Sequence, residues 1–314
     1  MKYIHCFQRE HEFSYSRFQR YDMIDSERID MKRRIIVGAH ISAAGGVYTA
    51  LTRAHAFPIF ALQMFGSSPK QYKVTVPSQD AVQQFKELRK EYAIQHIFLH
   101  APYLVNLASE KPFVRHMSRE ALAGHLQIAD TLEADGVVFH IGSVGVSGNK
   151  EQGIERVIQG IVRVYGDTDH HSLLIIENSS GGSGKLGTTI QEMAQILDGV
   201  SRPVGVCLDT AHLYGAGVLD FIEPQLKEFF QEWDAKIHHS ALKVIHANDS
   251  RGALGSFLDR HENIGEGHIG ERGFFSLATY NQVRSVPWIL EVPGFAGQGP
   301  DAENIAILNR IVQQ

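Results

Sequence analysis

The sequence predicts a single-domain α/β protein that forms a TIM (β/α)8 barrel behind a short N-terminal extension. Short apolar, β-branched runs alternate with stretches of helical periodicity, and this unit occurs eight times from residue 35 onward. Strands that alternate with helices form parallel sheets, because a parallel crossover needs roughly a dozen residues or more. Eight units within about 280 residues are close to the length of a typical barrel, which is roughly 250 residues.

Each expected strand is a short apolar run bounded by polar or glycine-containing turns. In chain order, the eight strands are expected at residues 35–41, 59–65, 96–101, 137–141, 173–177, 204–209, 242–246 and 288–291. Helices are expected where apolar residues recur every three or four positions, most clearly at residues 79–92, 119–134, 151–165, 190–197, 221–237 and 302–313. Residues 1–33 show neither period. We expect them to be an extension, disordered or foreign to the native chain, before a barrel domain of residues 34–314.

A doubly wound open sheet is the alternative architecture for the same alternation of strands and helices. It is disfavoured because no G-x-G-x-x-G sequence follows the first strand. The string Gly181-Gly-Ser-Gly184 does not match a phosphate-binding loop either, since no Gly-Lys-Ser/Thr follows at the required spacing. No low-complexity linker divides the chain, which favours one domain.

The composition excludes several classes of protein. Among 314 residues, 30 are Lys or Arg and 35 are Asp or Glu, so the net charge is −5 and no bulk basic surface is available for nucleic acid. No apolar run reaches the roughly 18 residues of a membrane span, and the N-terminus lacks the apolar core of a signal peptide. We therefore expect a soluble, cytoplasmic protein. Cys6 and Cys207 are too few for a disulfide framework and are expected to be free thiols.

Histidines and carboxylates gather at the ends of the predicted strands. The chain has 17 histidines, and the catalytic residues of a TIM barrel lie at the C-terminal ends of its strands. Nine residues of these types follow the third to eighth strands: His100, His140, Glu177, Asp209, His212, His246, Asp259, His261 and Glu291. Asp259 and His261 form an i, i+2 pair, which points both side chains to one side of an extended segment and suits two ligands of one ion.

These nine positions predict a multinuclear metal centre. Four carboxylates that converge at one face would repel one another and be costly to desolvate unless cations accompany them. Histidine and carboxylate ligands without cysteine suit zinc, manganese or iron. Three divalent ions would add six positive charges to the net charge of −5, giving +1, and such a centre would attract a phosphate.

The other histidines are not expected to bind metal. Six of them fall in a predicted helix or in polar segments between elements and are expected to face solvent: His116, His125, His170, His171, His238 and His239. His40 ends the first strand without a partner nearby in the sequence. We expect it to face the substrate or to support a ligand.

Five strings carry a resemblance to a known family. They are Gly38-Ala-His-Ile-Ser-Ala-Ala-Gly-Gly46, Ile176-Glu-Asn178, Cys207-Leu-Asp-Thr-Ala-His212, His246-Ala-Asn-Asp249 and Asp259-Arg-His-Glu-Asn-Ile-Gly-Glu-Gly267. Together they closely resemble the endonuclease IV family, the zinc-dependent apurinic/apyrimidinic (AP) endonucleases also called AP endonuclease family 2. The likeness runs from about Ile35 to the C-terminus and leaves only the extension uncovered.

The resemblance implies a DNA repair hydrolase with three zinc ions, with manganese as an alternative at one site. Such an enzyme incises DNA 5′ to an abasic site, leaves a 3′-hydroxyl and a 5′-deoxyribose phosphate, and removes 3′-blocking groups. The implied ligands are His100, His140 and Glu177 for the first ion, Glu177, Asp209, His246 and Glu291 for the second, and His212, Asp259 and His261 for the third. Glu177 would bridge two ions and Glu291 would orient or deprotonate the nucleophile, so both are implied as catalytic residues.

The implied partner is duplex DNA with an abasic or 3′-blocked lesion, bound by a monomer and recognised by its shape. Tyr103 and Leu104 match a loop that inserts into the base stack, although the residues alone favour ordinary packing of that loop. Lys70 and Tyr72 match a second DNA-binding loop, where Arg and Trp are usual, and Lys lacks the planar fork of Arg.

Two further departures from the family pattern fall near the expected site. Ile141 replaces a usual Pro after a ligand, which loosens that turn. Phe257 replaces a usual basic residue, which removes a phosphate contact.

The alternative function is that of a sugar isomerase or epimerase of the xylose-isomerase-like barrel group, which uses one divalent metal. One metal would leave His212, Asp259 and His261 without a function. An ultraviolet-damage endonuclease is closer in chemistry but lacks support from the five strings. A non-catalytic DNA-binding or scaffold protein would not explain nine acidic and imidazole side chains at strand ends.

Overall fold

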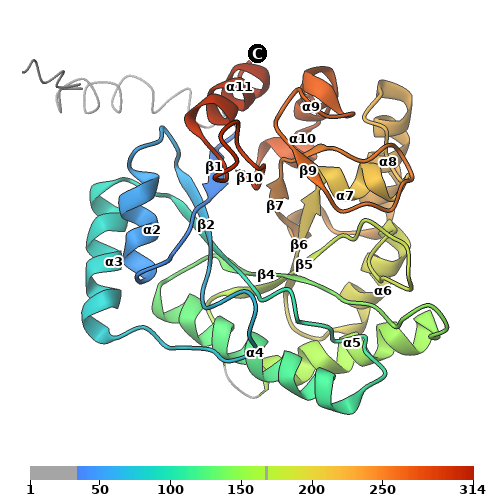
Figure 1. Cartoon of the computed structure of the whole chain (residues 1–314). Helices are drawn as coiled ribbons and strands as arrows, with labels where there is room; N and C mark the ends of the chain where they lie inside the picture. Colours follow the sequence, from blue (N-terminus) through green and yellow to red (C-terminus); the bar gives the residue numbers. More distant parts are fainter. Residues whose placement is uncertain (1–33, 167–168) are drawn as a thin grey trace, which may run out of the picture. The chain divides into compact units, whose positions relative to one another are not determined.

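In the computed structural model, which describes residues 34–166 and 169–314, eight parallel strands close into a barrel. Residues 35–314 form one compact unit, and the strands lie in the order β1-β10-β7-β6-β5-β4-β3-β2 around it (Figure 1). The predicted TIM barrel is confirmed, and the open-sheet alternative is excluded. The expected extension, residues 1–33, and with it Cys6, lies outside the described residues.

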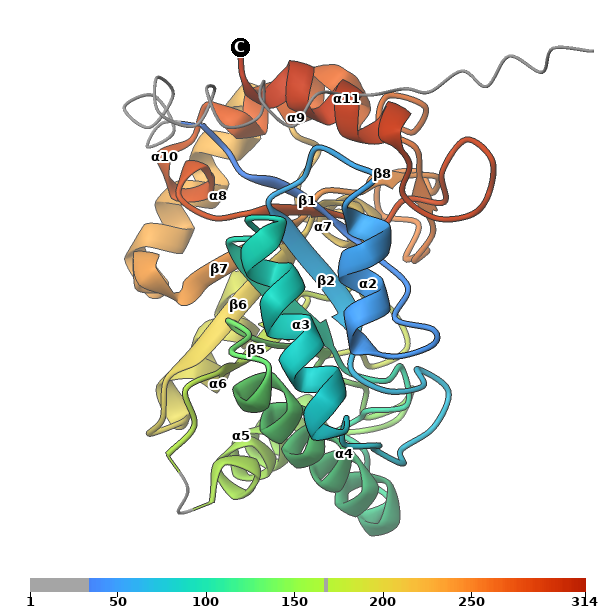
Figure 2. The same cartoon turned by 90° about the vertical axis from the view of Figure 1, so that its left-hand side faces the viewer.

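The strands and helices alternate around the barrel. Its strands are β1 (Val37–His40), β2 (Ala61–Phe65), β3 (His96–His100), β4 (Gly136–His140), β5 (Leu173–Glu177), β6 (Val204–Asp209), β7 (Leu242–His246) and β10 (Trp288–Leu290). The helices are α2 (Val47–Ala54), α3 (Gln79–Glu91), α4 (Pro112–Thr131), α5 (Lys150–Tyr165), α6 (Ile190–Gly199), α7 (Thr210–Gly215), α8 (Glu223–Lys236), α9 (Gly270–Ala278), α10 (Asn281–Arg284) and α11 (Ala302–Val312). Figure 2 shows α2 and α3 side by side outside β2.

Local sequence explains most helix starts. Ser78, Asn149, Thr189 and Asp301 each precede a helix, and each side chain accepts a hydrogen bond from a backbone N–H of the first turn. Helix α4 begins at Pro112, seven residues before the expected start at residue 119. Proline suits a first helical position because its missing N–H has no partner there in any case.

The expectation that His125 faces solvent is wrong. Its side chain is buried in α4, where Nδ1 donates to the carbonyl of Ala121 at 2.7 Å and Nε2 lies 3.0 Å from Ser67 Oγ. The absence of a side chain at Gly66 leaves room for the ring, since a Cβ there would lie 3.0 Å from the ring carbon Cδ2. His125 therefore connects α4 to the loop after β2.

Alternate strand residues fill the barrel in layers. A small apolar cluster crosses the interior: Ala61, Phe98, Val138, Ile175, Cys207, Val244 and Ile289. Two residues further along each chain segment, the position is polar: Gln63, His100, His140, Glu177, Asp209, His246 and Glu291. Side chains separated by two residues share a face of a strand. The seven polar residues therefore face the barrel interior as the apolar cluster does, and they form a polar ring at the carboxyl ends of the strands.

Candidate metal centre

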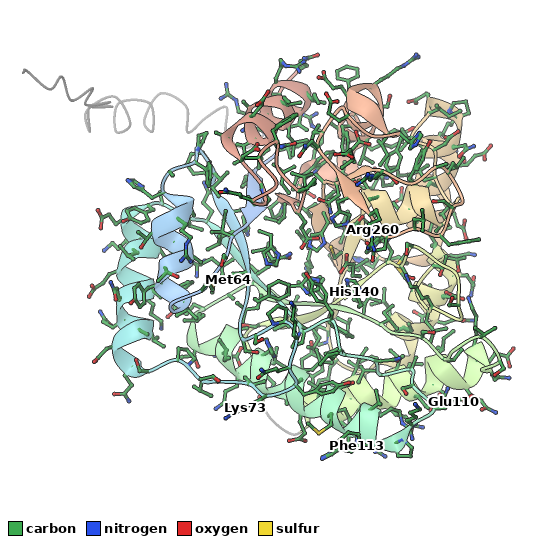
Figure 3. All side chains as sticks on the ribbon, in the orientation of Figure 1. Met64, Lys73, Glu110, Phe113, His140 and Arg260 are labelled. Atoms are coloured by element: carbon green, nitrogen blue, oxygen red, sulfur yellow. The ribbon has the colours of Figure 1, made fainter. Side chains whose placement is uncertain are left out.

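Glu177, at the end of β5, lies between four histidines. Its Oε2 is 3.2 Å from His100 Nε2 and 3.1 Å from His140 Nε2, while its Oε1 is 3.2 Å from His246 Nδ1 and 3.4 Å from His212 Nδ1. The Glu177 side chain is 1% exposed. His140 lies near the middle of the barrel in Figure 3. One buried carboxylate thus faces histidines from four different elements.

A second group joins Glu177 to the ends of β6, β7 and β10. His246 Nδ1 lies 3.1 Å from Glu291 Oε2 and 3.9 Å from Asp209 Oδ2. Ligand atoms of Glu177, Asp209, His246 and Glu291 all lie within 4.8 Å of one another, as do those of His100, His140 and Glu177. Glu177 therefore belongs to both groups.

The third group lies beside α7 and the hairpin formed by β8 (Asp249–Ser250) and β9 (His261–Glu262). Asp209, His212 and His261 bring their ligand atoms within 4.8 Å of one another. Asp259 Oδ1 lies 3.1 Å from His212 Nε2 and 3.8 Å from His261 Nε2. The structure brings all nine residues together. The family resemblance implied His212, Asp259 and His261 as the third ligand group, and the structure places Asp209 beside the two histidines as well.

Hydrogen bonds at the second ring nitrogen orient four of the histidines. The acceptors are Ala101 O for His100 Nδ1 (2.7 Å), Asn178 O for His212 Nδ1 (2.8 Å), Glu291 O for His261 Nδ1 (3.3 Å) and Gln63 Oε1 for His246 Nε2 (2.8 Å). A ring nitrogen that donates in this way leaves the other one free to bind a metal, which is the usual arrangement of histidine ligands.

Two ring nitrogens of the third group have no hydrogen-bond partner. His212 Nε2 and His261 Nε2 are buried, and although carboxylate oxygens lie 3.1 and 3.4 Å away, none of them has hydrogen-bond geometry. Buried polar atoms without partners are rare in folded proteins. Nitrogens and carboxylate oxygens that converge without bonding to one another fit the ligands of a divalent cation, and the donor set suits zinc.

Neighbouring charges strongly shift the pKa values of the buried carboxylates in this centre. Burial opposes ionisation of Glu177, yet the charges of His140 and His246 hold its pKa well below the usual range. Burial likewise opposes ionisation of Glu291, but His246 and His40 hold its pKa well below the usual range. Burial raises the pKa of the Cys207 thiol to about 12. Without a metal the thiol stays protonated, and Cys207 forms no disulfide, in agreement with the expected free cysteine. Its sulfur lies within 4.8 Å of ligand atoms of Glu177 and His246.

Zinc uptake is expected to depend on pH. Burial lowers the pKa of His212 and of His261, but the charge of Asp209 outweighs this effect in both residues. The pKa of His212, to which Asp259 also contributes, is raised to about 10, and that of His261 to about 9. Protonated rings stabilise the metal-free fold fully below pH 6.5, and this stability is lost as the pH rises through 9 to 10. Zinc needs neutral nitrogens. The Tm difference between zinc-loaded and chelated protein should therefore widen from pH 6 to pH 9, and an equal difference at both would contradict the expectation.

Three polar residues that support the ligands were not identified from the sequence. Gln63 Nε2 donates to Glu291 Oε1 at 2.6 Å, and its Oε1 accepts from His246. Asn178 Oδ1 accepts from the N–H of Asp209 at 2.6 Å, and Asn248 Nδ2 donates to Asp209 Oδ2 at 2.8 Å. The available signal for Gln63 was its place as the one polar residue in the apolar run of residues 59–65.

A cavity of about 1220 Å³ opens above the centre. The expected site residues that line it include His100, His140, Glu177, Tyr103 and Asp259, and His40 and Arg260 line it as well. His40 lies as expected beside a proposed ligand, with Nδ1 3.0 Å from Glu291 Oε1. The cavity gives a substrate direct access to the metal-binding groups.

A barrel with this polar ring belongs to a recognised class. The family model of the xylose isomerase-like TIM barrel matches residues 50–310. Within this class, "Probable endonuclease 4" of Halothermothrix orenii is 34% identical over 276 residues, which are 87% of this chain and 99% of the relative. The crystal structure of endonuclease IV from Thermus thermophilus matches with a TM-score of 0.75 and 32% identity, covering 88% of this chain and 97% of that one. The chain belongs to the endonuclease IV family.

Membership of this family confirms the resemblance found in the sequence and makes the chain a nuclease, which is a hydrolase. A D-tagatose 3-epimerase-like protein also matches, with a TM-score of 0.67 and 18% identity over 89% of this chain and 97% of that one. Identity at that level shows a shared fold alone.

Proposed function

We propose that this protein is a zinc-dependent AP endonuclease that cleaves the phosphodiester bond 5′ to an abasic site in duplex DNA. The convergence of three ligand groups around Glu177, at the base of a large cavity, carries the proposal. In this family member the products would be a 3′-hydroxyl and a 5′-deoxyribose phosphate. The same chemistry would remove 3′-blocking groups, because these also end in a phosphodiester or phosphomonoester at the 3′ position.

The nine residues would hold three zinc ions, with manganese as an alternative at one site. His100, His140 and Glu177 form the first set, and Glu177, Asp209, His246 and Glu291 form the second. In the third set, His212 and His261 would share their ion with Asp259, which lies 3.1 Å from His212 Nε2. When bound, divalent ions supply a nucleophile at neutral pH and neutralise charge on the phosphate.

The protein holds Glu291 in one orientation at this site. Its Oε1 accepts from Gln63 at 2.6 Å and lies 3.0 Å from His40 Nδ1, so its Oε2 faces His246. Its backbone N–H donates to Asn248 Oδ1 at 2.8 Å. A carboxylate fixed in this way can orient the nucleophile or accept its proton. Arg260 lines the cavity and offers a cation to the DNA phosphates.

The loop after β3 is suited to insertion between the stacked bases of DNA. Tyr103 and Leu104 are 62% and 41% exposed, and Tyr103 lines the cavity above the proposed metal centre. The loop is braced from outside, because Tyr72 Oη donates to the carbonyl of Leu104 at 2.7 Å and the Tyr103 N–H donates to Pro69 O at 3.3 Å. We propose that Tyr103 and Leu104 enter the duplex, that Tyr72 supports them, and that the exposed Lys70 contacts a phosphate.

Damaged duplex DNA as the substrate favours a location in the cytoplasm with the nucleoid, and binding by a monomer. In residues 34–166 and 169–314, no helix is long and apolar enough to cross a membrane. The alternative, a sugar isomerase or epimerase with one metal, is weaker. It would use one ligand group and leave the buried nitrogens of His212 and His261 without partners.

Incision of a duplex with one abasic analogue tests the proposal. The duplex is incubated with the protein as isolated, after prolonged chelation, and after zinc is restored, and the product ends are mapped. We expect cleavage 5′ to the lesion that disappears with the metal and returns with zinc. A fully zinc-loaded protein that leaves the duplex intact would reject the nuclease proposal, and sugar isomerisation would be tested next.

A further inference from the structure

Phe257 lies among the loops at the carboxyl ends of the strands, where it packs against the loop that follows β5. It is 54% exposed, and it stands two residues before Asp259 in the segment that supplies Asp259, Arg260 and His261 to the cavity. Its φ is 57°, in the left-handed region that a bulky side chain rarely adopts. An exposed aromatic residue on a strained backbone in the loop that supplies Asp259 and His261 calls for a functional reason, since such strain concentrates at functional sites.

The Phe257 ring rests on a floor of glycines. A Cβ at Gly181 would lie 2.9 Å from ring atom Cδ1, and a Cβ at Gly182 would lie 3.1 Å from Phe257 Cβ. Both glycines also have positive φ, of 76° and 74°. A side chain at Gly181 would displace the ring, and one at Gly182 would crowd the Phe257 Cβ. This contact explains the Gly181-Gly-Ser-Gly184 string, which is not a phosphate-binding loop and has no part in the metal centre.

Both the ring and its floor are fixed by backbone hydrogen bonds. The Phe257 N–H donates to the carbonyl of Gly215 at 2.8 Å. Below the ring, the Lys185 N–H donates to Gly182 O at 2.9 Å and the Val144 N–H donates to Gly184 O at 3.0 Å. One face of the aromatic ring is therefore held against the protein, and the side chain is still more than half exposed.

We infer that Phe257 is a stacking platform for the base opposite the lesion, a contact that rests on the proposed function. An abasic site leaves one base of the duplex without a pairing partner, and aromatic side chains stack on unpaired bases of any kind. DNA bound at the metal centre would cross the loops at the carboxyl ends of the strands, and Phe257 belongs to one of these loops, two residues before the cavity-lining Asp259. Leu254 and Leu258, in the same loop, are also exposed, and neither carries charge for a phosphate.

The experiment replaces the ring and follows the base directly. Phe257→Leu keeps an apolar side chain but removes the aromatic face, and Phe257→Trp restores one. The duplex carries an abasic analogue, 2-aminopurine opposite it, and a non-hydrolysable methylphosphonate at the scissile position. Binding to zinc-loaded protein is measured at two salt concentrations. Phe60→Leu is the matched control, since Phe60 is 37% exposed and precedes β2 at the opposite end of the barrel.

We expect Phe257→Leu to weaken binding about tenfold, to raise the 2-aminopurine fluorescence of the complex, and to leave the salt dependence of binding unchanged. Phe257→Trp and Phe60→Leu should resemble the wild type in affinity and fluorescence. Equal affinity and equal fluorescence for Phe257→Leu and the wild type would overturn the inference, and so would a loss in Phe257→Trp as large as that in Phe257→Leu. If the wild type neither binds nor cleaves abasic duplex, the proposed function fails instead.

Discussion

Glu177→Gln is expected to abolish incision, with a fall in turnover of more than about 100-fold. The substitution keeps the shape of the side chain but removes the negative charge that His100, His140 and His246 all approach within 3.2 Å. Because Glu177 belongs to two ligand groups, we expect both groups to bind metal less tightly. Metal content per chain, measured after dialysis, should fall together with the cleavage rate of an abasic duplex.

A matched control separates this effect from a general loss of charge. Glu271→Gln removes a carboxylate that pairs with Arg310 at 2.8 Å on the surface of α9. Exposed ion pairs of this kind contribute little to stability. The variant should keep the metal content and the cleavage rate of the wild type. Near-normal turnover in Glu177→Gln would reject the bridging role, and circular dichroism would show whether that variant remains folded.

The barrel and its ligand ring could be predicted because both depend on a short period in the chain. Within a strand, every second residue faces the interior, so the polar residue that ends an apolar run must lie at the catalytic end. Glu177 follows Ile175 and His246 follows Val244 in this way. The order of ligands along the chain is therefore already an order around the barrel.

Other features depend on packing between distant segments and could not be predicted. Helical periodicity alone does not decide whether His125 is buried or exposed. Its burial follows from contacts with Gly66 and Ser67, which lie far away in the sequence. Asp209 reaches towards both His246 and His261, with distances of 3.9 and 3.4 Å, because α7 begins directly after β6 and turns the chain there. No spacing in the sequence encodes that sharing.

Asp249 is expected to be as important for the centre as a ligand, although it contacts none of the proposed ions. Its buried carboxylate accepts hydrogen bonds from the backbone N–H groups of Ser250, Gly265, Gly267, Ile269 and Gly270, at 2.8 to 3.2 Å. Gly267 must lack a side chain, since a Cβ there would lie 2.4 Å from Asp249 Oδ1. The Gly-Glu-Gly part of the fifth string is thus explained as a loop that wraps around one carboxylate.

This loop carries the third ligand group. β8, which begins at Asp249, pairs with β9, and Ser250 lies opposite His261 in that pairing. Asp249→Ala would leave five N–H groups without this acceptor, and the loss would cost about 1–3 kcal/mol at each of the two buried residues, Ser250 and Ile269. We expect a loss of more than about 3 kcal/mol in the free energy of unfolding, a Tm lower by roughly 6–12 °C, and a fall in bound zinc from displacement of His261.

Asp130→Ala is the matched control for Asp249→Ala, because it removes a carboxylate that also accepts backbone hydrogen bonds but lies far from the candidate site. Asp130 also accepts backbone hydrogen bonds, from His171 at 3.0 Å and Ser172 at 2.8 Å, but it does so before β5, at the end of the barrel away from the metal centre. Its removal should lower the Tm while metal content and turnover at 25 °C stay close to those of the wild type. Asp249→Ala should lower the Tm, the metal content and the turnover. If Asp249→Ala loses stability but retains its full metal content and cleavage rate, the loop positions His261 without help from Asp249.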